Sequence, residues 1–191
     1  MVNFNGNLLS KNTSYLNHEN RGLRYGDALF ESIRVVNGKI FFWEDHYLRL
    51  MASMRILRME IPMNFTMEFL EEQLLACVEA NGLLEKPARI RFTVFRNNDV
   101  SYIIEANSLD SPFFTINSDA YEVELFKDFY VNADMLSTLK TNNKAINVVG
   151  SIFASENGYQ NCLLLNQEKR VVEALNGNLF LVKDQHIKPR P

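Results

Sequence analysis

One lysine and one glutamate, about thirty residues apart, carry side chains that could do covalent chemistry together. Lys140 lies shortly before a pattern that predicts a helix over 145–157, and a neutral lysine amine attacks carbonyl compounds. Glu173 lies among apolar residues of a strand-rich segment, where a carboxylate either faces solvent or pairs with a cation. Taken singly, both fit solvated surface groups, and Lys144 competes as the reactive amine. Neither residue indicates a function without the sequence around it.

A second group of candidates lies in the first quarter of the chain. Residues 21–34 hold three of them: Tyr25, Phe30 and Arg34. The pattern His-x-x-Arg-Leu follows at residues 46–50. An arginine fork binds phosphate through two hydrogen bonds, so Arg49 is a candidate phosphate ligand. The alternative interpretation is a solvated helix arginine beside a capping or surface histidine, His46.

The elements that must position these residues are helices and strands in mixed order. Apolar residues at helical spacing predict helices over 43–54, 66–81 and 145–157. Alternating or continuous apolar runs predict strands over 30–36, 39–43, 87–96, 100–106, 121–126, 161–166, 170–175 and 178–183. A polar stretch ending at Pro112 predicts a domain boundary. We therefore expect an α+β protein with domains over 1–111 and 112–191.

The motifs around the candidates resemble those of the pyridoxal-phosphate (PLP) enzymes of fold type IV. The resemblance rests on Leu-Lys-x-x-Asn at 139–143, Glu-x-x-x-x-Asn-Leu-Phe at 173–180, Arg-Gly-Leu-Arg-Tyr-Gly-Asp-Ala-Leu-Phe-Glu-Ser-Ile-Arg at 21–34, and His-x-x-Arg-Leu at 46–50. This family contains branched-chain and D-amino-acid aminotransferases and aminodeoxychorismate lyases. It implies a small N-terminal α/β sandwich domain and a larger, barrel-like C-terminal domain, incomplete here. It also implies a site between the domains and a homodimer that completes it.

The resemblance also implies a role for each candidate. Lys140 is the catalytic residue, which holds PLP as a Schiff base and then moves the α-proton as general base and acid. Glu173 keeps the pyridinium nitrogen protonated, and Arg49 binds the cofactor phosphate. The remaining contacts implied are those of Asn178 and Phe30 with the cofactor and of Tyr25 and Arg34 with the substrate.

Three functions remain open at this level. The first is a class IV aminotransferase that moves an amino group between a branched-chain-like amino acid and a 2-oxo acid. The second is an aminodeoxychorismate lyase that releases pyruvate and 4-aminobenzoate. Residues 30–34 favour the branched-chain type, but Ala145 stands where such enzymes place an aromatic hydroxyl. The third is a PLP-fold scaffold without catalysis, which the short 96–100 loop and the end of the chain at Pro191 favour.

Composition places the chain among ordinary globular proteins. It has 191 residues, 47% of them hydrophobic and 23% charged, with a net charge of −3. That charge gives no case for nucleic acid or an anionic membrane as partner, and no apolar run approaches a membrane span. Two cysteines without metal-ligand spacing, and an N-terminus unlike a signal peptide, favour buried free thiols, no metal site and a cytoplasmic location.

Overall fold

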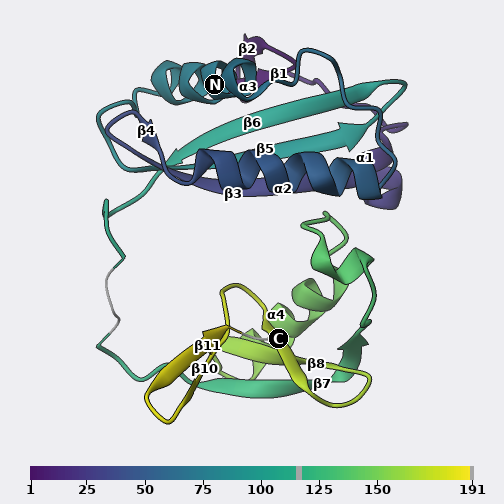
Figure 1. The fold of residues 1–191 in the computed structure, drawn as a ribbon, viewed down its shortest axis with the longest axis vertical. Coiled ribbons are helices and arrows are strands. Elements are labelled where there is room, and N and C mark those ends of the chain that lie inside the picture. Colours follow the sequence, from purple (N-terminus) through teal and green to yellow (C-terminus); the bar gives the residue numbers. More distant parts are fainter. Residues whose placement is uncertain (115–117, 190–191) are drawn as a thin grey trace. The chain divides into compact units, whose positions relative to one another are not determined.

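The computed structural model describes residues 1–114 and 118–189, which pack as two compact units (Figure 1). The first unit holds the described residues up to 114 and, in addition, Leu139–Asn143. The second holds residues 118–138 and 144–189. The domain boundary expected at 111/112 stays a prediction, but packing alone assigns the lysine segment to the first unit. The expected α+β class is confirmed by this mixture of helices and sheets.

The first unit is built on a six-stranded sheet with the order β2-β1-β6-β5-β3-β4, in which all neighbours are antiparallel. Its strands are β1 (Val2–Phe4), β2 (Asn7–Leu9), β3 (Ala28–Val36), β4 (Lys39–Ile40), β5 (Ala88–Arg96) and β6 (Val100–Ser108). The return strand expected over 39–43 is wrong in extent, because it ends at Ile40 and Trp43 already begins a helix. The β5–β6 pair follows the predicted alternation.

Two helices cover one face of this sheet, α2 (Trp43–Ile56) and α3 (Met67–Ala80) (Figure 1). Alternate residues of β3 and β5 point into the shared core, among them Ile33, Ile90 and Phe92. The Thr66 side chain accepts a hydrogen bond from the Phe69 amide, so it caps α3 as its position predicted. The short helix α1 (Arg21–Tyr25) was not predicted and ends at Gly26, which has a left-handed φ of 65°.

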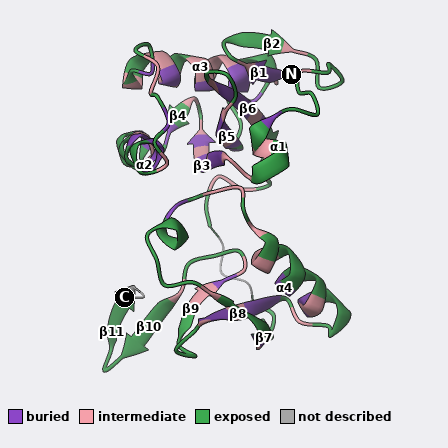
Figure 2. Cartoon of the chain, turned by 90° about the vertical axis from the view of Figure 1, so that its right-hand side faces the viewer, coloured by how far each residue is buried: buried purple, intermediate pink, exposed green. Residues whose placement is uncertain are grey.

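The second unit contains two sheets and one helix. Its elements are β7 (Val123–Val131), the 3-10 turn η1 (Leu136–Thr138), α4 (Ala145–Glu156), β8 (Asn161–Asn166), β9 (Val171–Ala174), β10 (Phe180–Lys183) and β11 (His186–Pro189). β7 and β8 are parallel, β9 joins β8 antiparallel, and β10 pairs with β11. Figure 2 shows that β8 is largely buried whereas β10 and β11 are exposed. The described residues show no barrel, only these three-stranded and two-stranded sheets.

Parallel strands need a crossover, and α4 provides it between β7 and β8. Phe126, Ala154, Cys162 and Leu164 form the small core between helix and sheet. Within the described ranges, no helix is both long enough and apolar enough to span a membrane.

Candidate functional site

The segment that carries Lys140 is held against the edge of β3. The Phe30 amide donates to the Lys140 carbonyl oxygen at 2.9 Å, and the Asn142 amide donates to the Ala28 carbonyl oxygen at 3.0 Å. Leu29 and Thr141 form an isolated bridge between these bonds, and Leu139 is buried in the first core. The backbone of Lys140 is therefore fixed, although its side chain is exposed.

The Lys140 amine lies near an aromatic ring that it shares with a second cation. Lys140 Nζ is 5.6 Å from the centroid of the Phe30 ring, and the Arg91 guanidinium is 4.0 Å from the same centroid. Arg91 Nη2 also donates to Asn142 Oδ1 at 3.0 Å. Burial lowers the pKa of the Arg91 guanidinium from its ordinary value, with Arg89 adding to this effect and Glu105 opposing it. The structure thus brings two predicted residues, Lys140 and Phe30, together.

Arg49 is engaged by a carboxylate that the sequence analysis did not single out. Its Nε donates to Glu31 Oε1 at 2.7 Å, and its Nη2 donates to Glu31 Oε2. His46 Nδ1 lies 2.8 Å from Glu31 Oε2. The Glu31 carboxylate is only 1% exposed, whereas the Arg49 side chain is 45% exposed. Two guanidinium nitrogens therefore bind an internal anion, and the predicted phosphate contact of Arg49 remains a prediction.

The local charges shift the pKa of both partners. Burial acts to raise the pKa of the Glu31 carboxyl, but hydrogen bonds from Arg49 and His46 and their charges outweigh it, so that pKa is lowered. The hydrogen bond to Glu31 raises the pKa of the Arg49 guanidinium. Glu31 is thus a buried, ionised carboxylate that depends on two neighbours in α2.

The two predicted substrate contacts lie in different surroundings. Tyr25 ends α1, is 64% exposed, and has the Arg21 guanidinium 5.1 Å from its ring centroid. Arg34 is half-buried, and its Nη1 donates to the carbonyl oxygens of Ser111 and Pro112 at 3.1 and 2.8 Å. Its guanidinium also lies 4.1 Å from the ring centroid of Phe114. Arg34 binds the chain's own segment after β6, and its substrate role stays a prediction.

Glu173 and Asn178 belong to the second unit and are described within it. Glu173 lies on β9, and its Oε1 is 3.9 Å from the amine of Lys144, the residue just before α4. Side chains 28% and 36% exposed at that separation form a weak ion pair. Asn178 is exposed between β9 and β10. Of the two lysines that compete in the sequence, Lys144 faces a carboxylate, and Lys140 has an ion pair with none of the described residues.

Three residues at this site were missed, namely Glu31, Arg91 and Asn142. Glu31 could have been found, because Leu29, Ile33 and Val35 alternate with it and are buried. A carboxylate in such a row needs a cationic partner. Arg91 follows Arg89 at the spacing of two that marks one strand face, but nothing in the sequence relates it to residue 142.

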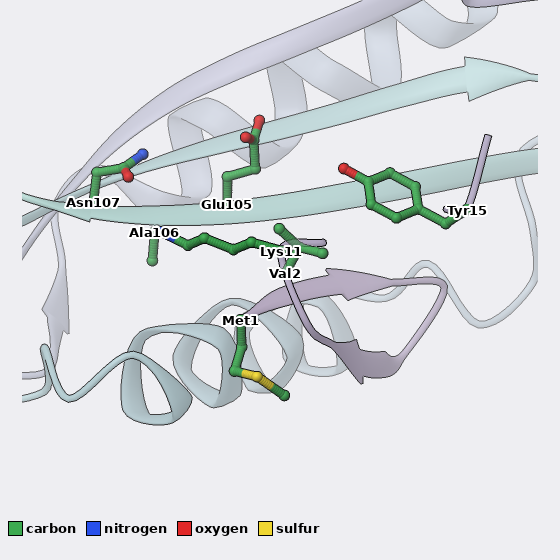
Figure 3. A pocket seen from close by; sticks show the side chains of 7 residues that line it. All are labelled: Met1, Val2, Lys11, Tyr15, Glu105, Ala106 and Asn107. Carbon is green, nitrogen blue, oxygen red and sulfur yellow. The ribbon is translucent and has the colours of Figure 1, made fainter. Parts of the chain in front are cut away.

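A hollow of about 130 Å³ lies elsewhere on the first unit (Figure 3). It is lined by Met1, Val2, Lys11, Tyr15, Glu105, Ala106 and Asn107. These residues belong to β1, β6 and the segment after β2, whereas the lysine segment adjoins β3. Pockets for organic ligands usually hold about 300–1,000 Å³. The hollow contains none of the predicted site residues, and we assign it no role.

Comparison with known proteins gives one family. The sequence model of the family described as amino-transferase class IV matches residues 28–187. The chain is 27% identical over 190 residues to a D-alanine aminotransferase of Listeria monocytogenes serotype 1/2a (strain 10403S). That match covers 94% of the chain and 64% of the relative, so the chain spans less than two thirds of that relative's length.

Solved structures have the same fold. A branched-chain aminotransferase from Thermoproteus uzoniensis, described with norvaline, superposes with a TM-score of 0.83 at 25% identity, over 100% of this chain and 67% of that one. A branched-chain amino acid aminotransferase from T.th., complexed with N-(5'-phosphopyridoxyl)-L-glutamate, gives a TM-score of 0.82 at 25% identity. It covers 97% of this chain and 65% of that one. These matches confirm the expected fold type.

Proposed function

Because the chain belongs to the class IV aminotransferase family, we propose that it is part of a PLP-dependent enzyme that transfers an amino group between an amino acid and a 2-oxo acid. The observation that carries the proposal is Lys140, whose backbone is fixed on the edge of β3 while its amine stays exposed. A reversible covalent bond to an aldehyde needs an accessible amine at a fixed position. The residues present therefore fit PLP at this point.

PLP supplies an electron sink that stabilises negative charge at the α-carbon of a bound amino acid. The chain's own residues have the other tasks. Lys140 holds the cofactor and then moves the proton at the α-carbon. The Glu173 carboxylate keeps the ring nitrogen protonated, and Arg49 binds the phosphate with the donors that Glu31 leaves available. Asn178 and Phe30 line the cofactor, and Tyr25 and Arg34 line the substrate, in a homodimer.

The donor amino acid is proposed to be branched-chain-like. The segment from Phe30 to Arg34 and the structural relatives of that specificity support this choice. The name of the Listeria relative makes D-alanine the competing donor. Amino transfer to 2-oxoglutarate from L-leucine and, separately, from D-alanine tests the choice. Release of 4-aminobenzoate from aminodeoxychorismate, without amino transfer from either donor, would instead identify a lyase.

Lys140 and Lys144 form a matched pair for testing the cofactor site. The chain is mixed with PLP, reduced with borohydride and mapped by peptide mass spectrometry. We expect one label per chain on Lys140, its loss in Lys140→Ala, and its retention in Lys144→Ala, whose lysine lies only four residues away. Full labelling of Lys140→Ala, or labelling centred on Lys144, would overturn the assignment. No label on a folded chain would favour the scaffold alternative.

A further inference from the structure

The face of the first sheet opposite α2 and α3 brings Arg91 and Phe30 together. In an antiparallel pair, directly opposed residues share a face. Phe30 opposes Thr93, and Ser32 opposes Arg91. Phe30 and Arg91 are therefore diagonal neighbours on one face, which explains how the guanidinium comes to lie 4.0 Å from the ring centroid.

The same guanidinium reaches a third piece of chain. Arg91 Nη2 donates to Asn142 Oδ1 at 3.0 Å, two residues after the lysine. The segment is otherwise fixed by two backbone hydrogen bonds around one isolated bridge. A pairing this short is the kind of contact that opens locally. Arg91 thus adds a charge-assisted hydrogen bond to a weak edge pairing.

Arg91 also occupies the ring that the lysine amine approaches. Arg91 is half-buried whereas Lys140 is exposed, and their cationic groups lie 4.0 and 5.6 Å from the same centroid. The guanidinium takes the closer position, so the amine is held at the outer, accessible side of the ring.

We infer that Arg91 is a positioning residue for Lys140. Through Asn142 and Phe30 it keeps residues 139–143 on the edge of β3 and directs the lysine amine to its accessible position. The meaning of that position for catalysis rests on the proposed function. The packing itself can be measured on the chain without cofactor.

Amide hydrogen exchange of the 191-residue chain tests the packing. In Arg91→Gln we expect the Phe30 and Asn142 amides to exchange about 10- to 100-fold faster, as loss of a charge-assisted hydrogen bond predicts. Asn142→Ala is expected to give a similar increase, and the double variant no more than either single variant, because one contact is lost in each case. Arg89→Gln is the matched control: it has the same charge change on the same strand face, and its residue is exposed.

A second readout separates positioning from simple stabilisation. Borohydride trapping of PLP gives the ratio of label on Lys140 to label on Lys144, which global stability does not change. We expect this ratio to fall about tenfold in Arg91→Gln and in Asn142→Ala, and to stay unchanged in Arg89→Gln.

Two results would overturn the inference: unchanged exchange at Phe30 and Asn142 in both Arg91→Gln and Asn142→Ala, or an unchanged label ratio in variants whose exchange increases. If Arg91→Gln does not fold, Asn142→Ala decides alone. Failure of the proposed function has a different signature, since the unsubstituted chain would then carry no label on Lys140.

Discussion

Replacing Arg49 with alanine would leave the buried Glu31 carboxylate without its main cation. Removing one partner of a fully buried ion pair costs about 3–5 kcal/mol. The Arg49 side chain is 45% exposed, so water would partly replace the guanidinium, and His46 Nδ1 remains 2.8 Å from the carboxylate. We therefore expect a smaller loss of about 2–3 kcal/mol at pH 7, a large share of a typical unfolding free energy of about 5–15 kcal/mol.

The loss should depend on pH with a defined sign. In the native chain the pKa of Glu31 is below its ordinary value of 4.5, so its contribution is present above pH 4.5 and is lost as pH falls through the folded pKa. In Arg49→Ala, burial remains and the main hydrogen bonds are gone, so the pKa should rise above 4.5. The penalty then grows as pH rises above that value. The difference between the two proteins is largest near pH 7 and shrinks towards pH 4.

Urea unfolding followed by tryptophan fluorescence measures this difference. Trp43 is the single tryptophan, is buried, and begins the helix that carries Arg49, so the signal reports on the first unit. Arg55→Ala is the control, because Arg55 is an exposed arginine of the same helix. Adding Glu31→Gln to Arg49→Ala should recover stability, since the unpaired buried charge disappears. The reasoning is refuted if Arg49→Ala loses no more than Arg55→Ala at pH 7, or loses the same amount at pH 4.

Two further predictions concern buried polar groups. The Tyr102 hydroxyl is buried without a hydrogen-bond partner among the described residues, and burial raises its pKa to about 12. Tyr102→Phe should therefore raise the unfolding free energy by about 1 kcal/mol in urea, and a clear loss would show that the hydroxyl is satisfied. Burial raises the pKa of the thiols of Cys77 and Cys162, so a thiolate-specific reagent should label neither at pH 8 until urea unfolds the chain, and fast labelling of the folded chain would contradict this.

Local patterns predicted the elements well. The helix expected over 145–157 is α4 over Ala145–Glu156, and the apolar run 161–166 is the buried strand β8. Both depend on periodicity and on capping within a short window, which is the information that one sequence holds. The family resemblance, and with it the fold type, is confirmed.

Contacts between distant segments were not predictable in the same way. Lys140 pairs with Phe30 although about 110 residues separate them, and no periodicity reports on such a pairing. Arg34 was expected to bind substrate, but the nearest acceptors are the carbonyl oxygens of Ser111 and Pro112. Arg49 was expected at a phosphate, and the carboxylate that it binds depends on how α2 lies over β3.

The pairing of residues 139–143 with β3 also bears on how the chain can be divided. β4 pairs only with Val35 and Val36, so the part of β3 near Phe30 has the lysine segment as its outer neighbour. A shortened chain that stopped at residue 114 would keep both helices and all six strands but lose that neighbour. Its Phe30 N–H and Ala28 C=O would stand at an open strand edge, which is a template for pairing with another chain. The lysine segment therefore also protects the first unit against edge-to-edge association.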